Sequence, residues 1–204
     1  MGTDIHSMLQ AKKNNEWIDI KSPLEDNRHY LLFAWLGNVR NGFGFAGIPT
    51  HTPIKFLSDC RGFPEGFKIA NDVHPVESKE LLPDWLQEYC KEDGLNMWMG
   101  DHSHSWLTGE EILNGADTEM ARVGVITLEQ YKNWDGKSSP DSWCGEITGG
   151  DIQTDLPENI NEKTTHVKIH WHETVLESLK YFIDEIKKLV DEHGEIRFVF
   201  GFDS

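Results

Sequence analysis

The most constraining feature of the sequence is a succession of strand, helix and strand patterns in residues 165–203. THVKIHWHE, 165–173, alternates polar and apolar residues, as a strand with one buried face does. Residues 174–194 repeat apolar side chains at helical spacing and end in Gly194, which predicts an amphipathic helix. IRFVFGFD, 196–203, predicts a closing strand. A right-handed crossover through the helix would make the two strands parallel neighbours.

The N-terminal part of the sequence predicts a hairpin and a helix. DIHSMLQA, 4–11, and WIDI, 17–20, read as two strands joined by the turn residues NNE. The next apolar stripe predicts a helix that begins at an N-cap, Asp26 or Asn27, and stops at Gly42.

Shorter helices are expected further along the chain. One is predicted over residues 80–94, and another begins at Thr127. Thr108 and Glu111 have the spacing of a capping box, so a helix is expected directly after Thr108.

These patterns together predict an α+β fold, in one domain over residues 1–204. We expect a mixed β-sheet of about four to five strands, with helices packed mainly on one face. Residues at about 41–78 are rich in glycine and proline and are expected to form a long loop. A second segment without periodicity, at about 135–164, is expected to be an insertion or a mobile lid.

The composition limits the classes of partner. The formal net charge is −16, from 35 acidic and 19 basic side chains, and this disfavours long nucleic acids, whose phosphates need a basic surface. The sequence has neither a signal-peptide pattern nor an apolar run of 18 residues, and its three cysteines include no CxxC pair. We therefore expect a cytoplasmic protein that does not contact membranes. Whether it forms a homo-oligomer is left open.

The stretch DHSHSWLT, 101–108, places His102 and His104 two positions apart, directly before a helix start. In an extended segment both imidazoles project to one side, where they can reach one metal ion or one phosphate. The N–H groups at the helix N-terminus favour an anion nearby, and Ser103 and Ser105 are expected to contact the same ligand. The alternative is a turn in which the histidines hydrogen-bond locally.

A second candidate motif is DIH, in which Asp4 and His6 share one face of the first predicted strand. A carboxylate and an imidazole at this spacing can serve as a ligand pair or as an acid/base pair. Asp4, His6, His102 and His104 are therefore the predicted catalytic residues, and the same four are the candidate ligands of a divalent metal ion. This requires His6 and His104 to lie within about 8 Å of each other across one concavity. The alternative for DIH is a polar strand face exposed to water.

Arginine and tryptophan residues complete the predicted site. Arg28 and Arg40 flank the first predicted helix and are expected to neutralise a phosphate. Trp106, Trp35 or Trp98 would stack on a base. Surface ion pairing is the alternative for each arginine taken singly.

The signatures of several enzyme classes are absent. The sequence has no GxxxxGK[ST], no GxGxxG directly after a predicted strand, no HExxH and no GxSxG. The polar face of residues 165–173, with three histidines and Lys168, is interpreted as a solvated sheet face. The motifs DIH and DHSHSWLT therefore stay the main candidates for chemistry.

Five short motifs together resemble a group of small phage and prophage proteins that begin MG(C)DIH and carry an (A/D)HSHSWLT block. The motifs are MGTDIH, the DNRHYLLFAWLGNVRNG helix, PIKFLSDCRGFP, DHSHSWLT and IRFVFGFDS, and they span roughly residues 1–67, 101–113 and 165–203. No reaction is established for the group, so the resemblance transfers no mechanism. Thr3 stands where the group often has Cys, which argues against a thiol nucleophile there, and FGFD stands where FWFD is usual.

The resemblance implies a counter-defence protein acting in the cytoplasm of an infected bacterial host, which is an inference from context. We expect it to bind a small phosphate-bearing ligand, a signalling nucleotide, in a His/Asp/Arg pocket and to hydrolyse it as a phosphodiesterase-type enzyme. Two alternatives stay open. One is a non-catalytic sponge that sequesters the same signal, and the other is an acidic inhibitor that binds a host enzyme.

Overall fold

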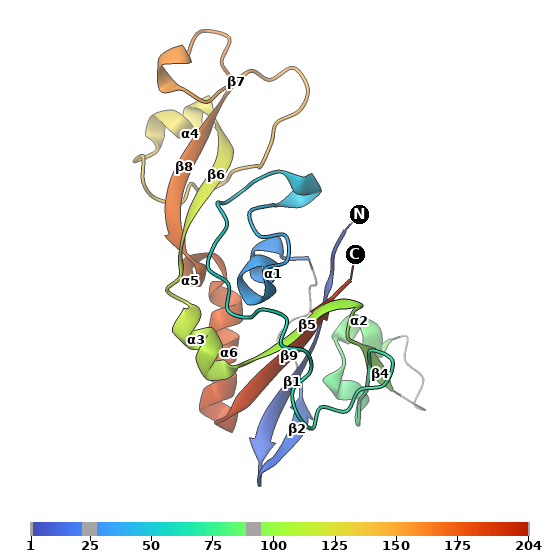
Figure 1. Cartoon of the computed structure of the whole chain (residues 1–204). Coiled ribbons are helices and arrows are strands. Elements are labelled where there is room, and N and C mark those ends of the chain that lie inside the picture. The colour runs from blue at the N-terminus through green and yellow to red at the C-terminus, as the bar shows by residue number, and fades with distance from the viewer. Residues whose placement is uncertain (1, 22–27, 89–94, 204) are drawn as a thin grey trace.

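The computed structural model describes residues 2–21, 28–88 and 95–203, and it has an α+β fold with three β-sheets (Figure 1). The fold class expected from the sequence is confirmed. The main sheet has the strand order β2–β1–β9–β5, and all neighbouring strands are antiparallel. Its strands are β1 (Ile5–Lys13), β2 (Glu16–Ile20), β5 (His102–Thr108) and β9 (Ile196–Phe202).

The predicted hairpin is present, with Lys13 of β1 opposite Glu16 of β2. Asn14 and Asn15 form the two-residue turn, at φ values of 51° and 67°. Two successive positive φ values are those of a type I′ turn, in which asparagine is favoured because it tolerates the left-handed region. The turn therefore fixes the register of the hairpin.

The central strand, β9, is buried along its whole length because a layer covers each face of the sheet. Three helices cover one face: α1 (Tyr30–Gly37), α3 (Gly109–Gly115) and α6 (Lys180–His193). Phe198, Phe200 and Phe202 pack against this helical layer. Val199 packs on the other face, against the two-stranded sheet of β3 (Val73–Pro75) and β4 (Asn96–Trp98).

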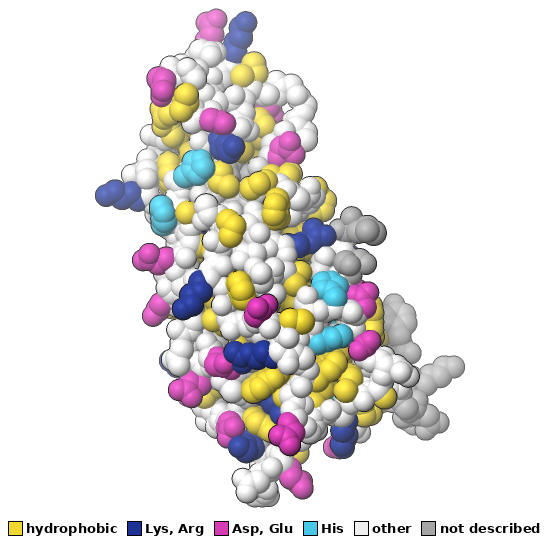
Figure 2. Space-filling model, viewed as in Figure 1, with side chains coloured by type: hydrophobic (Ala, Val, Ile, Leu, Met, Phe, Trp, Pro, Cys, Tyr) yellow, Lys and Arg dark blue, Asp and Glu magenta, His cyan; other side chains and the backbone are white. Residues whose placement is uncertain are grey.

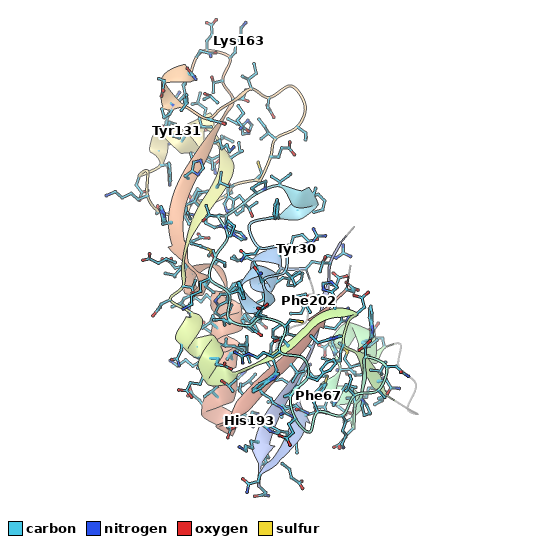
Figure 3. All side chains as sticks on the ribbon, in the orientation of Figure 1. Tyr30, Phe67, Tyr131, Lys163, His193 and Phe202 are labelled. Atoms are coloured by element: carbon cyan, nitrogen blue, oxygen red, sulfur yellow. The ribbon has the colours of Figure 1, made fainter. Side chains whose placement is uncertain are left out.

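A second, three-stranded sheet lies at one end of the molecule, away from the labelled Phe67 and His193 (Figures 1 and 3). Its strands are β6 (Glu119–Thr127), β7 (Gln153–Thr154) and β8 (His166–Thr174). Val167, Ile169 and Trp171 form its buried face, as their alternation predicts. Trp143 and Ile160 pack against this face, so the segment expected to be an insertion or a lid covers the second sheet. That segment also contains η3 (Pro157–Asn159).

The expectation that the strands at 165–173 and 196–203 are parallel neighbours is wrong. β8 lies in the second sheet with β6 and β7, whereas β9 is paired with β1 on one edge and β5 on the other, so neither edge of β9 is free to pair with β8. α5 (Val175–Ser178) and α6 carry the chain from the second sheet to the main sheet. The helix predicted as continuous is interrupted at Leu179, whose φ of −117° and ψ of 27° lie outside the helical range.

Helix α1 is shorter than predicted. Its N-cap is His29, and the expected caps Asp26 and Asn27 lie outside the described residues. The helix ends at Asn38 instead of Gly42, because Asn38 takes the left-handed conformation at φ 59° and its N–H closes the last turn. η1 (Phe45–Gly47) follows, within the predicted long loop.

Two predicted helix starts are confirmed by their capping boxes. Thr108 and Glu111 exchange the two reciprocal hydrogen bonds at the start of α3. Thr127 and Gln130 do the same at the start of α4 (Leu128–Asn133). Each box satisfies N–H groups that would otherwise lack a partner in the first helical turn.

The helix predicted over residues 80–94 is two short pieces, η2 (Lys79–Leu81) and α2 (Asp84–Gln87), and residues 89–94 lie outside the described residues. Pro83 separates the pieces because it has no N–H to continue the first helix. Among the described helices, none has the length and apolar character needed to cross a membrane.

Candidate functional site

Asp4 and Asp203 join the start of β1 to the end of β9. The Asp4 N–H donates to Oδ1 of Asp203 at 2.7 Å, and the Asp203 N–H donates to the Asp4 carbonyl at 3.2 Å. Arg28 donates to both carboxylate oxygens of Asp4, at 2.6 and 3.2 Å. This forked contact is the strong geometry for a guanidinium and a carboxylate. The carboxylate of Asp4 is therefore engaged by a cation of the same chain.

His6 lies beside this pair and is held from two sides. Its Nε2 is 3.3 Å from Oδ2 of Asp203, and its ring centroid is 4.6 Å from that of Trp98. Burial raises the pKa of the Asp203 carboxyl, but hydrogen bonds from Asp4 and His6 lower it more, so it lies below its usual 3.8. Asp203 thus orients the His6 ring, as carboxylates commonly orient functional imidazoles. Our sequence reasoning did not assign Asp203 to the site.

A β-bulge changes the expected geometry of DHSHSWLT. The pairing of β5 with β9 shifts register between His102 and Ser105, and Ser103 adopts a φ of 53°. The period of two that would place both imidazoles on one side is therefore broken. His102 Nδ1 lies 3.0 Å from the Ser103 hydroxyl, and its ring lies near Phe202. His102 thus makes the kind of local hydrogen bond that was expected if DHSHSWLT does not bind a ligand.

His104 packs over Gly201 of β9, at the position where a side chain would have no room. A Cβ on Gly201 would collide with the Met99 carbonyl oxygen and the His104 ring. His104 Nε2 lies 3.1 Å from the Gly100 carbonyl oxygen, and its ring stacks on Phe63 at 4.5 Å. The ring is therefore enclosed between a strand and a loop, with Nε2 already paired.

The predicted metal site is not formed. Asp4 is bound by Arg28, and His6 and His104 have the partners described above. Within residues 2–21, 28–88 and 95–203, no three His, Cys, Asp or Glu side chains are grouped so that they could hold a metal ion. The prediction that Asp4, His6, His102 and His104 share one metal ion is therefore wrong. Each of these four side chains instead contacts another group of the protein.

Two residues predicted to contact ligand belong to the interior. Trp35 is fully buried in the core between α1 and the main sheet, where it cannot stack on a base. Ser105 is also fully buried, with its hydroxyl against that of Ser58 and accepting from the Arg61 N–H at 3.1 Å. Both predictions are wrong because these side chains fix the packing of neighbouring segments.

Arg40 supports a cavity wall. Its Nε donates to the Thr3 hydroxyl at 2.9 Å, and its guanidinium lies 4.7 Å from the centre of the Tyr30 ring. Tyr30 and Arg28 line one side of a cavity of about 650 Å³. Thr3, where the resembling proteins often have Cys, is thus a hydrogen-bond acceptor for this wall.

The opposite side of the cavity is formed by the loop GFGFAG, residues 42–47, and by residues 143–148. Phe43 and Phe45 are exposed on the cavity wall, and Phe45 is 80% exposed. Exposed aromatic rings beside a cavity are typical of ligand-binding walls. The GxGxxG spacing of this loop is the one sequence pattern that could have marked it as a ligand-binding loop, although the loop follows a helix and not a strand.

A buried cation, Arg122, reaches the same cavity from β6. Its guanidinium lies 4.8 Å from the Trp143 ring and 6.0 Å from the Trp171 ring. Nε is 2.9 Å from Oε1 of Glu173, but its hydrogen is not aimed at an acceptor, so the contact is an ion pair. Burial lowers the pKa of Arg122, and Glu173 offsets part of that shift. Sequence reasoning missed Arg122, which sits in an ordinary alternating strand.

His51 lies against Arg122 and is also buried. Its Nδ1 is 2.8 Å from the Thr52 carbonyl oxygen, and its Nε2 has no hydrogen-bond partner. Burial lowers the pKa of His51, the hydrogen bond to Thr52 raises it, and the neighbouring Arg122 charge lowers it further. The net shift is downward, so the neutral ring is favoured beside the cation.

The arrangement thus defines an α+β protein with a cavity between α1 and the region of the second sheet, bordered by two guanidinium groups and several aromatic rings. The face of the molecule drawn in Figure 2 carries many acidic side chains. No protein-family model matches the chain, and comparisons with the curated proteins and the solved structures found no similar protein.

Proposed function

We propose that the protein binds a small phosphate-bearing ligand with a planar base, a nucleotide, in the cavity between α1 and residues 143–148, and holds it without cleavage. The observation that carries this proposal is the pairing of Arg28 and Arg122 with the aromatic rings of Tyr30, Phe43 and Phe45 in one cavity. Guanidinium groups suit phosphate, and aromatic faces suit bases.

Charge supports the choice of Arg28 as the phosphate contact. The chain carries a formal charge of −16, so an anion needs a local cation at its site. The Arg28 side chain is 64% exposed while it is anchored by Asp4, which leaves part of the guanidinium facing solvent. Arg28 is therefore placed to bind phosphate, with Asp4 as its positioning residue.

Retention without cleavage is favoured by the composition of the cavity wall. The His6–Asp203 pair, which has the arrangement of a general base and its orienting carboxylate, does not line this cavity. The phage-type resemblance fits a sponge that lowers the free concentration of a nucleotide signal, and this context is an analogy.

Hydrolysis is the second candidate, and the His6–Asp203 pair favours it. An imidazole oriented by an ionised carboxylate is a common general base, and this pair lies next to the Asp4–Arg28 contact. In this reading, phosphate bound at Arg28 would extend toward His6.

The first experiment is isothermal titration calorimetry with cyclic and linear adenine and guanine nucleotides, followed by recovery of the ligand after the protein is denatured. Binding with intact ligand supports the sponge, whereas product formation that is lost in His6→Gln supports the hydrolase. No measurable binding at millimolar nucleotide contradicts both.

Matched variants locate the ligand. Phe45→Ala removes a stacking face worth about 1–3 kcal/mol, so affinity falls at least about fivefold. Tyr181→Ala on α6, 70% exposed, is the control and leaves affinity unchanged. Arg28→Gln also weakens binding, whereas Lys188→Gln, with a side chain 66% exposed, does not. Equal affinities in all four variants would exclude this cavity as the site.

A further inference from the structure

A second cavity, of about 480 Å³, lies at the other end of the main sheet, on the face opposite the three helices. Trp17 of β2, Trp106 of β5 and Arg197 of β9 line it, together with the loop at Glu65. None of these residues lines the cavity proposed above for a nucleotide. Its volume lies within the range of small-molecule sites.

Arg197 is the unusual member of this cavity, because it is a cation that is only 3% exposed. Nε donates to Oε1 of Gln10 at 2.8 Å, and Nη1 donates to the Glu65 carbonyl oxygen at 3.1 Å. Nη2 is buried and has no hydrogen-bond partner. Buried guanidinium N–H groups are normally paired, so a free one next to a cavity marks a missing acceptor.

The charge of Arg197 is also left without a direct counter-ion. Among the ion pairs of the described residues, none involves Arg197, and its two acceptors are an amide and a carbonyl oxygen. Burial lowers the pKa of Arg197 to about 10, while the more distant Asp19 partly offsets this shift. A buried cation whose acceptors are neutral favours an anion as an additional partner.

The walls of the cavity are aromatic. The Arg197 guanidinium lies 4.2 Å from the centre of the Trp17 ring. The Arg61 guanidinium lies 5.5 Å from the centre of the Trp106 ring. Both tryptophans are partly exposed, so each has ring surface left for another contact. Flat apolar ligands gain most from such surfaces.

We propose that this cavity binds a small aromatic monocarboxylate, with the carboxylate accepting a hydrogen bond from Arg197 and the ring lying against Trp17 and Trp106. The Nη2 group, with two N–H donors, is without a partner, which suits a carboxylate as acceptor. Glu65 and Glu195 also line the cavity, and their charges disfavour a dianionic phosphate. The ligand class thus differs from that of the nucleotide cavity.

The test is an NMR titration of the full chain with benzoate, and with benzamide as a neutral molecule of the same shape. Benzoate is expected to shift the indole N–H signals of Trp17 and Trp106, assigned by Trp→Phe substitutions, and benzamide is expected to bind at least about tenfold more weakly. Phenyl phosphate is expected to bind more weakly than benzoate. Equal binding of benzoate and benzamide, or no binding of benzoate at millimolar concentration, would overturn the proposal.

Variants test the role of Arg197 directly. Arg197→Met, checked for folding by circular dichroism, is expected to weaken benzoate binding at least about tenfold. Arg61→Met removes a cation that lies near Trp106 but does not line the cavity, and it is the matched control, with benzoate affinity kept within about threefold at physiological salt. Benzoate binding that survives Arg197→Met contradicts the proposal.

A third variant covers the case in which Arg197→Met does not fold. Glu65→Gln removes an exposed negative charge from the rim, so benzoate binds about twofold more tightly and benzamide binds as before. A change that is the same for both ligands would contradict the proposal. Nucleotide binding is expected to be unaffected by any of these variants, so failure here and failure of the nucleotide site are distinguishable.

Discussion

The imidazole of His74 bridges β2 and the loop that covers the main sheet, through a contact of 2.9 Å from its Nε2 to the Asp19 carboxylate. Its Nδ1 faces the Lys68 carbonyl oxygen at 2.6 Å, and its ring stacks on Phe67 at 4.2 Å. Both ring nitrogens of His74 are therefore engaged, one by β2 and one by the loop. His74 holds the loop to the sheet by hydrogen bonding as well as by packing.

Replacing His74 by Phe is expected to destabilise the fold by about 1–3 kcal/mol, because it leaves one oxygen of the buried Asp19 carboxylate without its hydrogen-bond partner. The free energy of unfolding in urea measures this loss. His170→Phe on the exposed face of β8 is the control and should change it by less than about 0.5 kcal/mol. A loss of similar size in both variants would show that the His74–Asp19 contact has no special weight.

Acid is expected to weaken the link between β1 and β9. The pKa of Asp203 is lowered in the folded chain, so its ionised form stabilises the fold above its usual value of 3.8, and this stabilisation is lost as the pH falls through the lower, folded value. Asp203→Asn should therefore be less stable than the wild type at pH 6, and the difference should shrink on acidification below pH 3.8. Urea unfolding at a series of pH values measures it, and a difference independent of pH would contradict the assignment.

Gly201→Ala is expected to displace His104 and the main chain at Met99, because a Cβ at this position has no room. The expected cost is about 1–3 kcal/mol, as for other overpacked sites. Gly150→Ala is the control, since a Cβ there has no neighbour within 4 Å. Thermal unfolding followed by near-ultraviolet circular dichroism reports both, and an unchanged melting temperature for Gly201→Ala would refute the close packing.

The Arg122–Glu173 pair should be more sensitive to loss of one partner than of both. Arg122→Met leaves Glu173 buried without its cation and is expected to cost about 3–5 kcal/mol, whereas adding Glu173→Gln recovers part of that loss. Lys168→Met is the control, because Lys168 pairs with the exposed Asp155 at 3.8 Å. It is expected to lower the free energy of unfolding by less than about 1 kcal/mol. A double-mutant cycle in urea measures the coupling, and strictly additive losses would argue against the ion pair.

Local patterns predicted the elements of the fold well. The alternation at 165–173 identified the buried face of β8, and the capping boxes at Thr108 and Thr127 identified two helix starts. The partners of β8 and β9 could not be predicted from the sequence, because they depend on which strand edges other strands occupy, such as β1 and β5 on the two edges of β9. Strand partners are a property of the whole chain, whereas alternation and caps are local.

The candidate site was predicted only in part. Asp4, His6 and Arg28 do lie together at one end of the main sheet. The positive φ of Ser103 redirects the two histidines of DHSHSWLT, and no short-range signal marks a serine for that conformation. Trp35 was expected to stack on a base, but apolar residues continue around α1 and Leu31–Leu36 are all buried.

The position of β9 between β1 and β5 has a consequence for biosynthesis. Ile196–Phe202 are translated after both neighbours, so each neighbour leaves the ribosome with an unpaired edge. The main sheet can close only when this strand arrives, which makes its assembly a single late event instead of a stepwise one. A chain whose translation stalls before residue 196 would leave β1 with one unpaired edge and β5 without a partner strand in this sheet, and protection by a chaperone would matter most in that interval.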